Sequence, residues 1–70
     1  MPKYRHRYHL PERAVDGLGT LIYGDDDAAI QALAALDNEG VSVELWCQER
    51  QPRLLAIKAA DGSVRSVERP

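Results

Sequence analysis

Residues 24–36 read GDDDAAIQALAAL, and this stretch decides the fold because it predicts the helix of the chain. Asp25 or Asp26 can accept a hydrogen bond from the unpaired backbone N–H groups of the first turn, and the neighbouring carboxylates favour the positive end of the helix dipole. Alanine has the highest helix propensity, and four apolar side chains share one face: Ala29, Ile30, Leu33 and Leu36. The stretch therefore predicts a helix over Asp26–Glu39.

A glycine marks the predicted end of this helix. Gly40 stands where a left-handed residue closes many helices, since glycine adopts positive φ without a steric penalty. Val41 and Leu36 would then form the hydrophobic pair of a Schellman motif. We expect Gly40 to have positive φ.

Side chains alternate with a period of two on both sides of the helix, which is typical of half-buried strands. The predicted strands cover residues 3–10, 18–23, 41–48, 53–60 and 63–67. Pro11–Gly17 is predicted to be a connection, and Asp61-Gly62 to be a type I′ hairpin turn. We therefore expect a single α+β domain over residues 1–70, in the order β-β-α-β-β-β, with the helix packed on one face of a four- or five-stranded antiparallel sheet. One short helix cannot cover both faces of such a sheet.

A chain of 70 residues with one cysteine has limited means of stabilisation. Its core alone supplies roughly 3–5 kcal/mol, and Cys47 has no second thiol for an internal disulfide or a zinc site. Residues 1–7 lack the apolar run of a signal peptide, and no stretch approaches the ~20 apolar residues of a membrane span. We expect a cytoplasmic protein without membrane association, either a monomer or an oligomer.

The net charge of −2 hides an uneven distribution. Residues 1–13 have four Lys or Arg against one acid (+3), residues 14–49 have eight acids and no Lys or Arg (−8), and residues 50–70 have five Lys or Arg against two acids (+3). We expect the two basic ends to lie beside each other and the acids to lie along the helix, since charge runs are usually solvated faces. A role of the charges in steering a partner is the alternative.

Catalytic and metal-binding patterns are missing from the sequence. There is no Gly-rich phosphate loop, nucleophile elbow or His-Glu-x-x-His helix. His6 and His9 are three residues apart on a predicted strand and so point to opposite faces. Asp25–Asp27 lack the ligand spacing of a calcium loop, and Cys47 belongs to an apolar stripe in which a thiol acts as a small hydrophobe. We expect no enzyme activity, no cofactor and no bound metal.

Trp46 lies on the sheet face that the helix leaves uncovered, if Val43 and Leu45 face the helix. These three residues belong to one predicted strand, and side chains alternate between its two faces. An exposed apolar patch usually marks an interaction site, and Trp is enriched in interface hot spots. We favour a non-catalytic protein-interaction or homodimerisation domain that uses this face. The alternative is that a strand end, the N-terminal arm or the Pro11–Gly17 loop folds over Trp46 within one chain.

The neighbours of Trp46 depend on the register of the next strand, which is apolar on both of its sides. One register places Leu54 and Ala56 beside Trp46, and the other places Leu55 and Ile57 there. The candidate residues for binding a protein partner are therefore Trp46, Leu54, Leu55 and Ile57.

Single-stranded nucleic-acid binding through the first strand is the rival hypothesis. Lys3, Arg5 and Arg7 would project from one face of that strand and contact phosphates. Two features count against it: the tyrosines of the strand point to the opposite face, and the overall charge is negative.

With these elements in place, the chain resembles a family of short uncharacterised bacterial proteins, a domain of unknown function. The similar features are the Tyr-containing first strand (4–10), the Asp-capped, Ala-rich helix start (25–30) and the Val-Glu-Leu-Trp strand with its arginine turn (40–50). The resemblance covers residues 4–57. The His- and Arg-rich first strand and the longer Pro11–Gly17 connection depart from the family's pattern. The resemblance implies this fold, and it implies no activity, cofactor or site residue.

Overall fold

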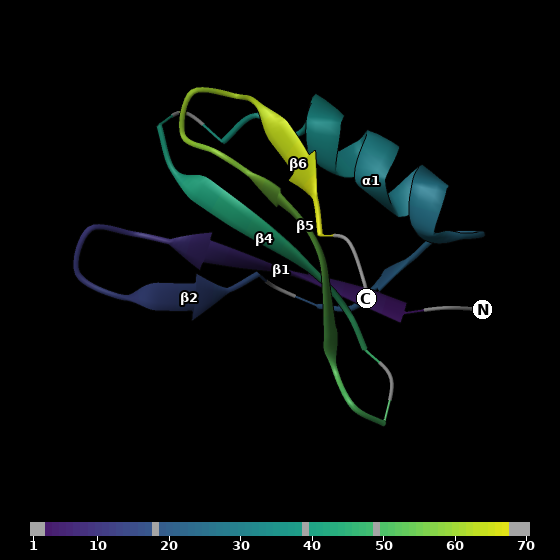
Figure 1. Cartoon of the computed structure of the whole chain (residues 1–70). Coiled ribbons are helices and arrows are strands. Elements are labelled where there is room, and N and C mark those ends of the chain that lie inside the picture. The colour runs from purple at the N-terminus through teal and green to yellow at the C-terminus, as the bar shows by residue number, and fades with distance from the viewer. Residues whose placement is uncertain (1–2, 18, 39, 49, 68–70) are drawn as a thin grey trace.

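The helix packs against one face of an antiparallel sheet (Figure 1). The computed structural model describes residues 3–17, 19–38, 40–48 and 50–67. The elements in chain order are β1 (Lys3–His9), β2 (Ala14–Asp16), β3 (Leu21–Ile22), α1 (Asp26–Ala35), β4 (Ser42–Cys47), β5 (Arg53–Lys58) and β6 (Val64–Ser66). The predicted α+β fold with one helix is thus confirmed, and the described residues form a sheet of six strands instead of the four or five expected.

The additional strand, β2, forms inside the Pro11–Gly17 segment that the sequence predicts to be a connection. The backbone N–H of Leu10 donates to the carbonyl of Arg13 (2.9 Å), so the chain reverses and β2 pairs with the second half of β1. The N–H of Gly17 donates to the carbonyl of His6 at 2.7 Å just beyond β2. A Cβ atom on Gly17 would lie 3.3 Å from that carbonyl oxygen, so a larger residue would crowd the backbone there.

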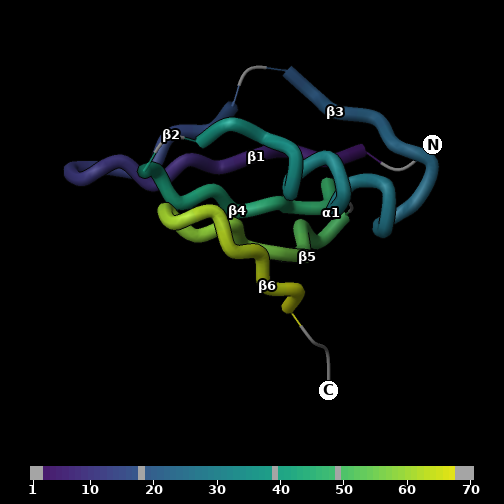
Figure 2. Tube along the Cα trace, turned by 90° about the horizontal axis from the view of Figure 1, so that it is seen from above, coloured from purple at the N-terminus to yellow at the C-terminus, as the bar shows by residue number. Residues whose placement is uncertain are grey.

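The predicted strand over residues 18–23 is reduced to β3, which pairs with Lys3 and Tyr4; residue 18 lies outside the described residues. β2 and β3 therefore share one edge of β1, and the sheet order is β2-β1-β4-β5-β6. β4 lies between β1 and β5, so the strands of the two basic segments do not pair with each other. Figure 2 looks down on α1, with β3 beyond β1 on one side and β6 at the opposite edge.

α1 begins as its sequence predicts. Asp25 is the N-cap residue, and its carboxylate accepts a hydrogen bond from the backbone N–H of Ala28 at 2.8 Å. Asp26 accepts a hydrogen bond from the Tyr4 hydroxyl (2.8 Å) and pairs with Arg53 (3.4 Å). Because Tyr4 is fully buried in the core, these contacts tie the start of α1 to β1 and β5.

α1 ends earlier than predicted, at Ala35. Leu36 leaves the helix with an extended backbone (φ −69°, ψ 135°). The buried ammonium group of Lys58 on β5 donates hydrogen bonds to the carbonyls of Ala34 (2.9 Å) and Leu36. A cation from another strand therefore satisfies carbonyls at the helix end and complements the negative end of its dipole.

Gly40 has positive φ (81°), as predicted, but it does not cap the helix. It lies in a separate turn, closed by a hydrogen bond from the N–H of Val41 to the carbonyl of Asn38 (2.9 Å). The predicted Schellman motif is therefore wrong, because the chain has already left the helix at Leu36. Glu39, the predicted last helical residue, lies outside the described residues.

The core lies between α1 and the sheet. Its buried apolar side chains are Tyr4, Ala29, Leu33, Val43, Leu45, Cys47, Leu55 and Ala56. Val43 and Leu45 lie in this core, on the helix side of β4, which leaves Trp46 on the other side as predicted.

β5 contains a β-bulge opposite the middle of β4. Leu45 pairs with Ala56, whereas the next residue, Trp46, pairs with Leu54. Leu55 is therefore an extra residue on β5, and its side chain joins the core. The bulge changes which β5 side chains share a face with Trp46.

The hairpin between β5 and β6 forms at the predicted place with a different turn. Gly62 has positive φ (96°), and its N–H donates to the carbonyl of Ala59 at 2.9 Å, so it is the last residue of the turn. This geometry is that of a three-residue loop closed by a left-handed glycine, and the predicted type I′ turn is wrong. Hydrogen bonds from the backbone N–H and hydroxyl of Ser63 hold the pKa of Asp61 below its ordinary value.

Candidate functional site

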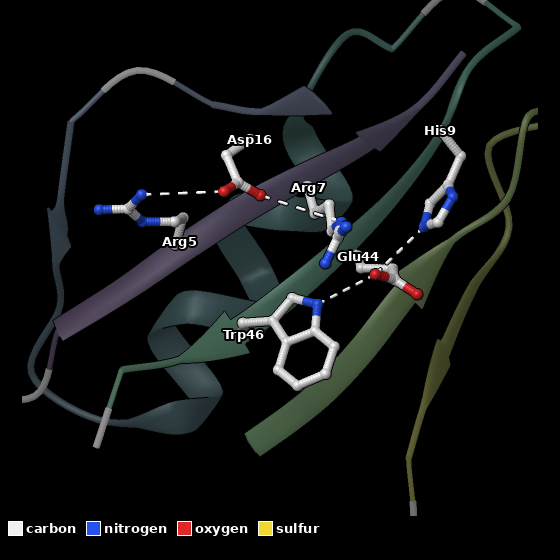
Figure 3. A network of polar contacts seen from close by, with 6 residues as sticks. All are labelled: Arg5, Arg7, His9, Asp16, Glu44 and Trp46. Carbon is white, nitrogen blue, oxygen red and sulfur yellow. Dashed lines mark hydrogen bonds and ion pairs between the residues drawn. The ribbon is translucent and has the colours of Figure 1, made fainter. Parts of the chain in front are cut away.

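The sheet face opposite α1, called the open face below, carries the candidate site (Figure 3). Cross-strand pairing places Arg5 of β1 opposite Trp46 of β4, and Arg7 opposite Glu44. Arg7 is also opposite Asp16 of β2. Because directly opposed residues share a face, these side chains form one surface that spans β2, β1 and β4. α1 lies behind the sheet in this view.

Two arginines share one carboxylate on the open face. Arg5 lies 4.0 Å from Asp16, and Arg7 lies 3.9 Å from the other carboxylate oxygen. Both distances exceed a normal hydrogen bond, so Asp16 does not hold either guanidinium group tightly. A guanidinium group has five N–H donors. The pair therefore retains positive charge and donors for another anion.

Glu44 is the centre of a second polar cluster on this face. Its Oε1 accepts a hydrogen bond from the Trp46 indole N–H at 3.0 Å and lies 3.1 Å from the His9 Nε2. Burial alone would raise the pKa of Glu44, but these two hydrogen bonds and the charge of Arg7 outweigh it and hold the pKa below its ordinary value. Glu44 is thus charged at neutral pH and engaged within the chain.

Trp46 is half-buried, and Figure 3 shows its indole ring with one face turned toward the viewer, away from α1. Its polar edge is already occupied by the hydrogen bond to Glu44. A shallow hollow of about 290 Å³ lies beside the ring, lined by Arg5, Arg7, Asp16, Trp46, Gln48 and Pro52. The outward ring face and the donors of the hollow are the groups that a ligand would meet.

The apolar neighbours of Trp46 differ from both predicted registers. Because of the bulge, Leu54 lies opposite Trp46 and Ile57 lies opposite Glu44, and both side chains are half-buried. Leu55 packs in the core and does not lie beside Trp46. The apolar part of the open face is therefore smaller and less exposed than the sequence predicts.

The open face is basic although the whole chain is acidic. Its described cations are Lys3, Arg5, Arg7 and Arg65, and its described acids are Asp16 and Glu44. With His9 neutral, four cations against two acids give +2, compared with −2 for the chain. Asp25–Asp27 lie at the start of α1, on the other side of the sheet. The structure therefore places a net positive charge on one side of the sheet, which the net charge of the whole chain does not show.

Other candidate residues do not assemble into a site. His6 is opposite the buried Leu45 and His9 is opposite Ser42, so the histidines point to opposite faces, as predicted. Burial lowers the pKa of His6. Cys47 is 2% exposed in the core. Within residues 3–17, 19–38, 40–48 and 50–67, no three His, Cys, Asp or Glu side chains are placed to hold a metal ion, and no helix is long and apolar enough to cross a membrane.

Sequence reasoning missed Asp16, Glu44 and Gln48 as parts of the site. The sequence does not predict Asp16 as a site residue, because the pattern Asp-Gly predicts a turn. In the structure Asp16 is the last residue of β2 and lies opposite Arg7. Glu44 had a usable signal, since it stands two residues before Trp46 on the same predicted face.

Comparisons of the chain with models of known protein families, with curated proteins and with solved structures find no match. The resemblance to the short bacterial family therefore remains a prediction.

Proposed function

We propose that this chain is a non-catalytic interaction domain whose open face binds a partner that carries negative charge. One observation carries the proposal: Arg5 and Arg7 share a single carboxylate at 4.0 and 3.9 Å, next to the outward ring of Trp46. A charge-assisted hydrogen bond is roughly twice as strong as a neutral one. Since Asp16 lies beyond normal hydrogen-bond distance of both arginines, an incoming anion that forms shorter, charge-assisted hydrogen bonds can compete with it for these guanidinium groups.

The lining of the hollow supports binding and not catalysis. It consists of two arginines, one carboxylate, one amide, an indole and a proline. These groups fix charge and hydrogen-bonding edges, and the set contains no nucleophile paired with a general base. The nearby His9 is engaged with Glu44.

A second copy of the chain fits this face less well than a different partner. The sequence favours a homodimer or another protein on the face around Trp46. Two open faces brought together would oppose two surfaces that each carry a net positive charge, and like charges across an interface cost several kcal/mol. The half-buried Leu54 and Ile57 offer little apolar area to offset that cost. A different protein with an acidic surface remains within the proposal.

Heparin, a polyanion, provides the direct test. A protein with net charge −2 is expected to pass through a heparin column, whereas a basic face should retain it at low salt. We expect retention of the wild type, weaker retention of Arg5→Gln and of Arg7→Gln, and unchanged retention of Arg13→Gln. Arg13 is an exposed arginine in the β1–β2 turn, so its variant changes the net charge equally.

Passage of the wild type without retention would contradict the proposal. Sedimentation at tens of micromolar separates the homodimer from the heterologous partner. A monomer agrees with the charge argument. A dimer that dissociates in Trp46→Ala would show that the partner of the open face is a second copy of the chain and not an anionic molecule.

A further inference from the structure

We propose that the anionic partner is a single-stranded nucleic acid, with a base stacked on Trp46 and the backbone phosphates held by Lys3, Arg5 and Arg7. This inference rests on the proposed function and names the chemistry of its partner. The sequence counted against nucleic-acid binding because the tyrosines of β1 point away from the cations. In the structure, the aromatic residue that shares the face with the cations is Trp46 of β4.

The state of the Trp46 side chain favours stacking. Its N–H already donates to Glu44, so the free part of the indole is the ring face turned outward in Figure 3. Nucleobases bind sheet surfaces by stacking on such ring faces, and every base offers a π-face regardless of sequence. A ligand that required a hydrogen bond from the indole would first have to displace Glu44.

The spacing of the cations favours an extended polyanion. Lys3, Arg5 and Arg7 alternate along β1 on the open face, so successive cations are about 6.8 Å apart along the strand. This repeat suits the phosphates of an extended single strand. The charged Glu44 would repel phosphates, which directs the backbone along β1 and leaves the base on the β4 side.

Other anionic macromolecules fit the face less well. The major groove of duplex DNA admits a helix or a two-stranded ribbon, whereas this face spans several strands. A protein partner needs an apolar, desolvated pocket for its hot-spot residues, whereas four of the six residues that line the hollow beside Trp46 have charged or amide side chains. An acidic protein is therefore an outcome of the test and not the proposal.

Fluorescence offers a direct assay, because Trp46 is the only tryptophan of the chain. The probes are an oligothymidylate of about ten nucleotides, which suits a small binding face, the abasic strand of equal length, and a polyglutamate peptide. We expect the oligothymidylate to quench Trp46 saturably and to bind at least about five-fold tighter than the abasic strand. The logarithm of its affinity should fall against the logarithm of salt with a slope of about −2, from three phosphate contacts at about −0.7 each.

Variants locate the binding, with a labelled strand followed by fluorescence anisotropy. Arg5→Gln and Arg7→Gln should each weaken binding several-fold and reduce the salt slope by about 0.7, whereas Arg13→Gln should change neither. Trp46→Leu should remove the preference for the oligothymidylate over the abasic strand. Circular dichroism of each variant confirms that it is folded.

Three outcomes would overturn the inference. Equal binding of the abasic strand without quenching would leave only a basic face, and binding of polyglutamate alone would identify an acidic protein as the partner; in both cases the proposed function stands. If the protein bound none of these probes but was retained on heparin, the proposal that the partner is a single-stranded nucleic acid would also be refuted. Loss of heparin retention as well would refute the proposed function itself.

Discussion

Tyr4 connects the strand that carries the arginines to the start of the helix, and Tyr4→Phe tests this connection. The substitution removes only the hydroxyl that donates to Asp26 at 2.8 Å, since Phe fills nearly the same volume. A hydrogen bond to a charged acceptor contributes about 1.5–3 kcal/mol. The Asp26 side chain is 48% exposed and can be hydrated in the variant, so we take the lower end. We expect a loss of about 1.5 kcal/mol in the free energy of unfolding at neutral pH.

The pH dependence makes this prediction sharper. Burial first, and then the hydrogen bond to Asp26 and its charge, raise the pKa of Tyr4 from 10.0 to about 12. Because the folded pKa lies above the unfolded value, this contribution is fully present below pH 10 and is lost as the pH rises through 12. With partial hydration near Asp26 taken into account, this pKa difference corresponds to about 2 kcal/mol. The advantage of the wild type over Tyr4→Phe should therefore vanish by pH 12.

Urea unfolding of both proteins at several alkaline pH values measures this difference. Comparison with the variant cancels the effects of all other groups that titrate in the same range. An absorbance titration of the phenols should also lack its most alkaline step in Tyr4→Phe. If the difference in unfolding free energy stayed constant from neutral pH to pH 12, Tyr4 would not be buried and hydrogen-bonded to Asp26 as described.

Three further predictions concern the helix start, one turn and one histidine, all measured by urea unfolding. Asp25→Ala should cost about 1 kcal/mol through loss of the N-cap, and an equal cost for the exposed Asp27→Ala would contradict the assignment of the cap. Gly40→Ala should cost about 1 kcal/mol because φ is 81°, and a neutral result would contradict this backbone geometry. Burial lowers the pKa of His6 below 6.5, so its contribution is present above pH 6.5 and lost as the pH falls. In a His9→Gln background, which leaves His6 as the only histidine, His6→Gln should reduce the loss of stability between about pH 7 and pH 5; an unchanged loss would show that His6 is not buried.

Local signals in the sequence predicted most of the fold. Asp25 and the alanines that follow it predict the helix start, because capping and propensity act within a few residues. The end of the helix depends on Lys58, which lies on β5, more than 20 residues further along the chain. The local pattern at Gly40 therefore predicts the wrong helix end. β2 was missed because Pro11 and Asp16-Gly17 predict loops, and the short strand becomes favourable only beside β1.

The candidate site was predictable in part. Alternation along β4 placed Trp46 on the face opposite Val43 and Leu45, and the structure confirms this placement. The bulge at Leu55 could not be predicted, since residues 54–57 are apolar on both sides of the strand. The proximity of Arg5 to Trp46 depends on β1 pairing with β4 across a long stretch of chain, which periodicity does not reveal.

The central claim is that the open face is the binding surface. A titration followed by 15N–1H correlation spectra tests it most directly, with oligothymidylate added to the labelled protein and the single indole N–H signal reporting Trp46. We predict shifts of the backbone signals of Arg5 and Arg7 and of the Trp46 indole, with signals from the helix residues Gln31 and Ala34, which are exposed on α1, unchanged. Shifts confined to α1, or no shifts at saturating strand, would contradict the assignment of this face.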